Sequence, residues 1–328
     1  MSANGDVPYE ESELYRKRHS AAHVMAEAVV ACFPEVKLAI GPPIEDGFYY
    51  DFDLGEDKNG NPRTFSPDDL ENIEQKMKAL LKKNAPFEHS TMSVDEAREF
   101  FADQPYKLEL IDDLAAGKED ENGNPISEPV TEVSIYRQRE FVDLCRGPHV
   151  GYTKQVKANA TKILRSSGAY WRGDENNPQL QRIYGTAWDN RIDLDDYLKR
   201  LEEAKERDHR RLGKQLELFH ISSLVGSGLP LWLPKGTILR DELEKFLREA
   251  QIKRGYLPVI TPHIGNLDLY SSSGHYPYYK DSQYSPIEID DEQFLLRPMN
   301  CPHHIEIYRS KPRSYRDLPV RLAEFGTV

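Results

Sequence analysis

Cysteine is scarce in this sequence: Cys32, Cys145 and Cys301 are the only three in 328 residues. So few thiols, in an odd number, argue against a framework of disulfides and fit a reducing compartment. Long apolar runs are also missing, and residues 1–18 are polar and lack the apolar core of a secretion signal. We therefore expect a cytoplasmic protein with no membrane partner.

Net positive charge is absent as well, because 43 Lys and Arg residues stand against 55 Asp and Glu residues, for a net charge of -12. That balance argues against indiscriminate binding to nucleic acid. Basic residues nevertheless cluster in segments 153–173, 205–214 and 309–321, and the first of these contains no acidic residue. Each segment is either a solvated face or part of a local phosphate-binding track.

The chain is long for a single hydrophobic core, so two domains are expected. Capping residues and apolar periodicity predict helices over 11–33, 66–83, 193–215 and 237–255, one starting after Ser93, and one over 104–117. Aromatic and β-branched residues predict strands over 47–53, 131–144 and 181–186. Segment 226–236 is rich in glycine and proline and is expected to form turns.

Histidine and cysteine occur in two four-residue spacings. His19 and His23 lie at i and i+4 of the first expected helix, so both imidazoles project from one face. Cys145 and His149 follow an expected strand, in a glycine-proline turn. If the chain folds back to join these residues, they can bind a metal or move protons; taken singly, such residues are more often satisfied core or surface groups.

Several motifs, in a single order, resemble those of bacterial-type threonyl-tRNA synthetases, a family of class II aminoacyl-tRNA synthetases. The motifs are His19 to His23, Gly47-Phe48-Tyr49-Tyr50-Asp51, Asp143 to His149, segment 201–210 and Arg297 to Pro302. The resemblance extends from Tyr15 onward and implies an α+β fold. It implies an editing domain of helices on a mixed or antiparallel sheet over residues 1–192, a linker helix over 193–215, and the start of an antiparallel class II catalytic core over 216–328.

In that family the first domain hydrolyses seryl-tRNA that is made in error. The resemblance implies that His19 and Lys107 position and activate the attacking water. Residues that hold the substrate or orient these groups match His23, Tyr50, Asp143, Cys145 and His149. The similar alanyl editing pocket binds zinc, whereas the threonyl family edits without a metal. We therefore expect no metal in this pocket and keep zinc as the alternative.

Cys301 matches the first zinc ligand of the family's aminoacylation site, whose two histidine ligands lie further along than this sequence reaches. A zinc ion that takes both the amino group and the hydroxyl group of threonine rejects valine. Serine keeps the hydroxyl group and lacks only a methyl group, whose contribution to binding is about 1 to 3 kcal/mol. The zinc site therefore also accepts serine. A second, hydrolytic site is then needed to remove serine that has been attached in error. ATP and Mg²⁺ are the other cofactors that the resemblance implies.

The sequence ends at Val328, before the motif 2 arginine that would contact ATP, and His303 and His304 lie too close to Cys301 to replace distant ligands. We therefore expect the amino-terminal part of a threonine–tRNA ligase that does not activate threonine by itself. The implied partners are tRNA(Thr), threonine and serine as aminoacyl esters, and a second copy that pairs through the region around Pro262. The alternatives are a free-standing hydrolase of Ser-tRNA(Thr) and a noncatalytic tRNA-binding protein.

Overall fold

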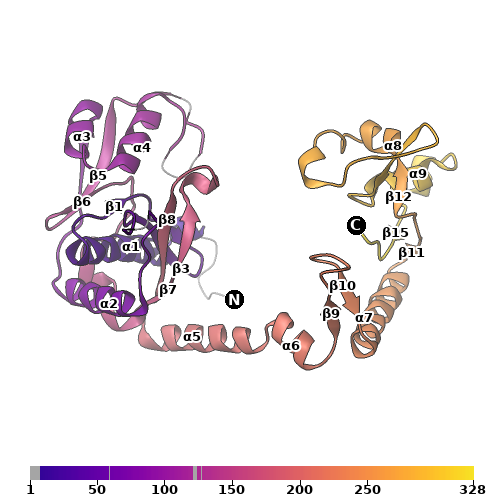
Figure 1. Ribbon diagram of the computed structural model, residues 1–328, viewed down its shortest axis with the longest axis horizontal. Coiled ribbons are helices and arrows are strands. Elements are labelled where there is room, and N and C mark those ends of the chain that lie inside the picture. Colours follow the sequence, from indigo (N-terminus) through magenta and orange to yellow (C-terminus); the bar gives the residue numbers. More distant parts are fainter. Residues whose placement is uncertain (1–7, 59, 121–123, 127) are drawn as a thin grey trace. The chain divides into compact units, whose positions relative to one another are not determined.

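The computed structural model describes residues 8–58, 60–120, 124–126 and 128–328, so the first seven residues of the polar amino terminus lie outside the described ranges. The chain divides into unit 1, Met1–Ala204, and unit 2, Lys205–Val328. Figure 1 labels the elements of both units. Within the described ranges, no helix has the length and apolar character needed to cross a membrane.

Unit 1 is built on a five-stranded antiparallel sheet with two long helices on one face (Figure 1). The strands are β1 (Lys37–Leu38), β2 (Pro43–Ile44), β3 (Gly47–Asp53), β7 (Thr161–Tyr170) and β8 (Gln179–Ala187), and the helices are α1 (Glu13–Cys32) and α2 (Pro67–Lys82). Phe48, Tyr50 and Phe52 alternate along β3, so all three point to the helix-covered face and join the larger apolar core. This core fixes α1 against the sheet.

A smaller layer of unit 1 carries a second apolar core. It consists of the antiparallel strands β4 (Glu88–Ser93), β5 (Glu132–Gln138) and β6 (Phe141–Leu144) with helices α3 (Val94–Phe100) and α4 (Pro105–Ala115). Leu110 and Ile111 of α4 pack with Ile135 of β5 and Leu144 of β6. Because Leu144 is anchored in this core, the turn that follows β6 is held at a fixed place.

Two of the predicted helix starts of unit 1, at Ser66 and after Ser93, are confirmed by their caps. Ser66 and Ser93 each accept a backbone N–H three residues on and form capping boxes with Asp69 and Glu96. Gly117 adopts a φ of 69° just beyond α4, a conformation that favours glycine. The strands predicted over 47–53, 131–144 and 181–186 correspond to β3, to the β5–β6 hairpin and to β8.

Unit 2 consists of short strands and helices with few buried apolar side chains. Its elements are α6 (His209–Gln215), β9 (Phe219–Ile221), β10 (Pro230–Trp232), α7 (Pro234–Lys253), β11 (Leu257–Pro258), β12 (Ile264–Asn266), α8 (Leu267–Ser272), β13 (Ile287–Ile289), β14 (Glu292–Leu296), α9 (Cys301–Arg309) and β15 (Leu322–Ala323). β12, β14 and β13 form an antiparallel sheet, β9 pairs with β10, and β11 pairs in parallel with β15. Within the described ranges, the 3₁₀ turns are Tyr9–Glu11, Thr153–Gln155, Ala158–Ala160, Trp171–Gly173, Lys280–Ser282 and Tyr315–Asp317.

Three sequence predictions in and near unit 2 are wrong in detail. The helix expected over 193–215 is two helices, α5 (Arg191–Glu206) and α6, because Asp208 turns its carboxylate onto the Arg210 N–H at 2.8 Å and caps a new start. Thr237 does not cap α7, which begins at Pro234, where a proline suits the first turn. The segment expected to contain only turns includes β10.

Candidate active site

The seven predicted residues of the editing site come from separate segments of unit 1, and the structure brings them together. His19 and His23 project from α1, Tyr50 from β3, Lys107 from α4, and Asp143 from β6, while Cys145 and His149 lie in the turn that follows β6. A cavity of about 490 Å³ is lined by His19, His23, Lys107, Asp143 and Cys145, among other residues. Tyr50 and His149 support this cluster through their contacts with Asp143 and Cys145.

Asp143 is the centre of the polar contacts. Its carboxylate lies 2.5 Å from Lys107 Nζ, accepts a hydrogen bond from Tyr50 Oη at 2.6 Å and lies 3.6 Å from His23 Nε2. Lys107 also donates to Tyr50 Oη at 3.2 Å. All four side chains are buried, so the ion pair between Asp143 and Lys107 offsets the cost of burying either charge alone.

Burial also acts on the ionisation of Tyr50. It raises the pKa of the phenol well above its usual value, and the negative charge of Asp143 adds to the effect. Tyr50 therefore stays protonated and donates. Gly41 leaves room for its ring, because a Cβ built at position 41 would lie 2.0 Å from Tyr50 Cδ2. A glycine is needed there for the tyrosine to reach Asp143.

The hydrogen bonds of His19 define its tautomer. Its Nδ1 lies 3.2 Å from the Pro148 carbonyl oxygen, which can only accept, so this nitrogen carries the proton. The Nε2 lone pair then faces Cys145 Sγ at 3.3 Å. Burial, followed by the proximity of His23, lowers the pKa of His19 to about 3. The ring is therefore neutral near pH 7, with its Nε2 lone pair directed into the cluster toward Cys145 Sγ.

His23 and His149 are neutral for the same physical reason. Burial lowers the pKa of His23 to about 3, with a further contribution from the positive charge of Lys107. Burial and the two neighbouring imidazoles lower the pKa of His149 well below its usual value. The cluster thus combines neutral imidazoles with a single buried ion pair.

His149 is fixed by residues that the sequence analysis missed. Ser20 Oγ lies 3.1 Å from His149 Nδ1 and accepts the Val150 N–H at 3.0 Å. The ring of Phe87 stacks on His149 with centroids 4.9 Å apart and an interplanar angle of 4°, and Tyr136 lies edge-on at 4.4 Å. Ser20 lies between the two histidines of α1 in the sequence, so its position in that motif could have indicated a role in the site. No sequence pattern indicates such a role for Phe87 or Tyr136.

The cluster also fits the donor set of a soft metal ion. One ligand atom from each of His19, His23, Cys145 and His149 lies within 4.8 Å of the others, and Cys145 Sγ is 3.3 Å and 3.4 Å from the two nearest imidazole nitrogens. Three nitrogens and one sulfur are a donor set that suits zinc. The carbonyl that holds His19 Nδ1 would orient this ligand. The arrangement can therefore hold a metal or handle a water molecule without one.

Cys301 lies in a different setting. It is exposed at the first residue of α9 and lines a cavity of about 700 Å³ that Asp268, His275 and Glu306 also line. Among the residues that the structure describes, Cys301 belongs to no cluster of three or more metal-ligating side chains. The ring of His303 instead lies beside Tyr270, at a centroid distance of 6.0 Å. Cys301 as a zinc ligand stays a prediction.

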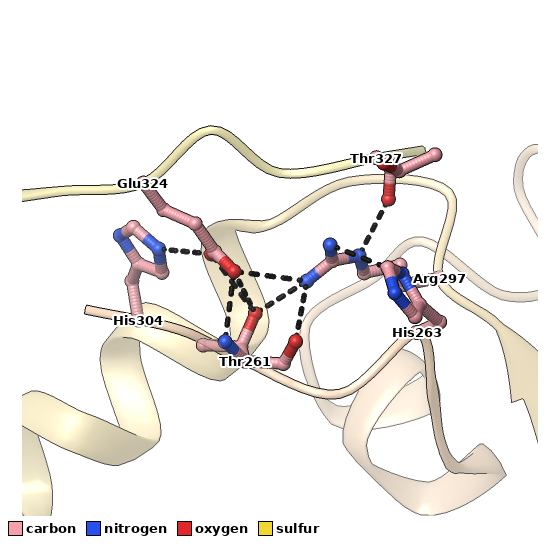
Figure 2. A network of polar contacts seen from close by, with 6 residues as sticks. All are labelled: Thr261, His263, Arg297, His304, Glu324 and Thr327. Carbon is pink, nitrogen blue, oxygen red and sulfur yellow. Dashed lines mark hydrogen bonds and ion pairs between the residues drawn. The ribbon is translucent and has the colours of Figure 1, made fainter. Parts of the chain in front are cut away.

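A buried polar network ties together the elements around Cys301 (Figure 2). Glu324 accepts the Thr261 N–H at 2.8 Å, lies 2.9 Å from His304 Nε2 of α9, and lies 3.5 Å from Arg297 Nη1. Burial opposes ionisation of Glu324, but the hydrogen bonds from His304 and Thr261 and the charge of Arg297 outweigh it and lower its pKa to about 2. His304 is thus occupied by Glu324.

Residues 133–184, which include Asp143, Cys145 and His149, match the family model described as the threonyl and alanyl tRNA synthetase second additional domain. The chain therefore contains this domain, in an α+β unit whose pocket gathers histidine, cysteine, lysine and aspartate.

The wider chain is similar to the threonine–tRNA ligases over nearly its whole length, as the motifs predicted. The threonine–tRNA ligase of Dehalococcoides mccartyi is 52% identical over 317 residues, which cover 97% of this chain and 50% of the relative. That of Deinococcus deserti is 53% identical over 318 residues, or 95% of this chain and 46% of the relative. The chain thus spans about half the length of the curated relatives it matches. Among solved structures, the RNA binding domain of threonyl-tRNA synthetase from Cryptosporidium parvum matches with a TM-score of 0.35 and 42% identity over 37% of this chain and 30% of that chain.

Proposed function

We propose that unit 1 hydrolyses the ester bond of Ser-tRNA(Thr), as the editing part of a threonine–tRNA ligase. The observation that carries the proposal is the convergence of His19, Lys107, Asp143 and Cys145 on one cavity of unit 1. The similarity to threonine–tRNA ligases supplies the substrate. Water adds to the seryl carbonyl carbon, the bond to the ribose oxygen breaks, and serine and tRNA with a free terminal hydroxyl leave.

His19 and Lys107 are the residues that position and activate the water in this proposal. The Nε2 lone pair of His19 can accept a hydrogen bond from the water, and the negative charge of Asp143 favours the imidazolium as the proton moves. Two of the three N–H groups of Lys107 point to Asp143 and Tyr50. Its third can hold the water or the ester carbonyl oxygen, where negative charge develops.

The other residues act as supports and substrate contacts. Asp143 holds Lys107 in place and is itself held by Tyr50 and His23. Cys145 and His149 form the wall beside His19. A site made of such mutually constrained groups is pre-organised, so small displacements of any member are expected to reduce the rate.

The pocket is proposed to work without a metal, with zinc as the alternative. The positive charge of Lys107 is felt at His23 and lies beside Asp143, so it repels a dication that enters the cluster. If zinc does bind, His19, His23, Cys145 and His149 would hold it, and it would supply a more acidic bound water.

The aminoacylation function of the relatives is proposed for the protein to which unit 2 belongs. Cys301 would hold zinc with ligands that these residues do not provide, and ATP and Mg²⁺ would serve threonine activation. The proposed partners are tRNA(Thr), threonine, and a second copy in a homodimer. Apolar side chains exposed on α7, including Leu239, Leu243 and Phe246, are available for such an interface. Cytoplasmic location belongs to the same proposal.

The test is a deacylation assay of the purified chain with Ser-tRNA(Thr) and Thr-tRNA(Thr). We expect rapid release of serine and slow release of threonine. His19→Ala and Lys107→Ala should each slow serine release by about 10²- to 10⁴-fold, the usual worth of general acid–base groups. Lys154→Ala, which removes an exposed lysine outside the pocket, should change little. Unchanged serine release in both pocket variants would refute the assignment.

The same assay separates the alternatives. A chelator should leave serine release unchanged; a loss that zinc restores would establish the metal alternative. A noncatalytic tRNA-binding protein would bind tRNA with a strong salt dependence and cleave no ester. A free-standing hydrolase would show the same deacylation, so the coding sequence after Val328 distinguishes it from the leading proposal.

A further inference from the structure

Two stacks of a guanidinium on a tyrosine ring lie next to each other on the sheet of unit 1, and the two rings are tilted by 52° to one another. The Arg182 guanidinium lies 3.9 Å from the centroid of the Tyr49 ring, and that of Arg165 lies 4.1 Å from the centroid of Tyr184. The two tyrosine rings are 6.0 Å apart. We call Arg182, Tyr49, Tyr184 and Arg165 the arginine–tyrosine stack.

The register of the sheet places the stack on the face opposite α1 and α2. Tyr49 pairs with Tyr184, and Tyr184 pairs with Arg165, across β3, β8 and β7. Directly paired residues share a face, whereas the neighbouring Phe48 and Tyr50 point into the core. Arg165 is exposed, and the other three members are partly exposed.

The inner end of the stack adjoins the candidate active site. Tyr49 and Arg182 line a second cavity of about 370 Å³, together with Trp171. Ile40 and Leu110 line both this cavity and the reactive one. A ligand that enters the reactive cavity can therefore extend past these two side chains onto the stack.

The charge and shape of the stack favour an unpaired nucleotide chain over other ligands. A guanidinium plane on an aromatic ring gives a flat, cationic surface on which bases stack without sequence preference. Asp51 neutralises Arg182, with paired contacts at 2.7 Å and 2.8 Å. Across the described parts of the chain, no carboxylate pairs with Arg165, so its charge is available to a phosphate.

We propose that the arginine–tyrosine stack binds the unpaired nucleotides of the RNA whose ester enters the reactive cavity. Bases stack on the guanidinium planes of Arg182 and Arg165, and a phosphate lies near Arg165. The inference rests on the proposed function, since it names the surface by which that substrate is held. The stack therefore contributes to substrate affinity and positioning and takes no part in the bond-breaking step.

The experiment compares binding of two labelled RNA hairpins to the full chain by fluorescence anisotropy. One hairpin has a single-stranded tail at its 3′ end, and the other is blunt. We expect the wild type to prefer the tailed hairpin. Arg165→Gln and Tyr184→Leu should each weaken tail binding by about tenfold, within the range for losing one stacked base. Arg165→Lys, which keeps the charge and loses the plane, should also weaken it.

Lys157→Gln is the matched control. It removes one exposed positive charge from the same basic segment, but next to the 3₁₀ turn that packs on α2. It should change tail binding by less than about twofold, a weak and screened surface effect. Equal losses for Arg165→Gln and Lys157→Gln, a wild-type affinity for Arg165→Lys, or equal binding of the two hairpins would overturn the proposal. Thermal melting checks that each variant folds. If Tyr184→Leu does not fold, the result for Arg165→Gln alone decides the test.

Failure of this inference is distinguishable from failure of the proposed function. If the wild type does not release serine from Ser-tRNA(Thr), the proposed function fails, whatever the hairpins show. If it releases serine but Arg165→Gln binds the tail as the wild type does, only the stack is wrongly assigned.

Discussion

At the scale of single residues, His149 shows what a sequence can and cannot reveal. Its spacing from Cys145 indicated a shared site, because four positions across a turn bring side chains together. Its stacking on Phe87 depends on a contact across sixty-two positions that no local pattern encodes. The seven predicted pocket residues were available from motif resemblance, whereas the packing that keeps the imidazoles neutral appears only in the folded chain.

The buried histidines predict a specific pH dependence of stability. Burial lowers the pKa of His19 and His23 to about 3 and that of His149 well below normal. The unfolded chain therefore binds these protons first as the pH falls below about 6.5. Their neutral forms stabilise the fold fully above that pH, and this stabilisation is lost as the pH falls toward 3. We expect the melting temperature of unit 1 to fall between pH 7 and pH 5.5, before most carboxylates titrate.

The variant His149→Gln should flatten that fall, because one depressed imidazole is gone. His89→Gln, at an exposed position on β4, is the control and should keep the wild-type profile. Melting followed by circular dichroism across the pH range measures both. A fall of equal steepness in all three proteins would contradict the role given to the buried imidazoles.

At the scale of elements, the helices with strong local signals were predicted and the irregular breaks were not. The capping boxes at Ser66 and Ser93 predict the starts of α2 and α3. The break between α5 and α6 was missed because charged residues with high helix propensity run through it, and the Asp208 cap overrides them. α7 starts earlier than predicted because Pro234 suits the first turn of a helix, and this preference outweighs the capping preference of Thr237.

The Glu324 network predicts which elements of unit 2 depend on one carboxylate. Glu324 of the segment after β15 binds Thr261 between β11 and β12 and His304 of α9. Glu324→Gln would leave Arg297 buried without its charged partner, a change that costs about 3 to 5 kcal/mol when buried pairs are broken. Amide hydrogen exchange around residues 257–264 and 300–309 should become faster.

Glu306→Gln is the matched change for that experiment. Glu306 also lies on α9, but it is exposed and its ion pair is with Arg309, three residues on. Such surface pairs contribute about 0 to 1 kcal/mol, so exchange should stay close to wild type. Faster exchange in both variants would show that any loss of a carboxylate in this region destabilises α9, and that the Glu324 network has no specific stabilising role.

At the scale of the whole molecule, the two candidate sites lie in different units. Every residue of the candidate active site lies in unit 1, and Cys301 and the Glu324 network lie in unit 2. The sequence predicted two domains from length, and the motifs assigned a different activity to each. Short strands such as β11 and β15 could not be placed from the sequence, since two residues carry no periodicity.

This separation makes a prediction for catalysis. Glu324→Gln should leave kcat/KM for serine release within about twofold of wild type, because Glu324 and its printed partners Thr261, Arg297 and His304 all belong to unit 2, whereas the pocket residues all belong to unit 1. Steady-state deacylation in the absence of ATP measures it. A large loss would mean that the state of unit 2 controls the editing pocket.

The pocket draws on α1, β3, α4 and the turn after β6, and β3 is paired on one side by β8, which ends at Ala187. A chain still growing on the ribosome therefore cannot form this chamber until almost all of unit 1 has emerged from the exit tunnel.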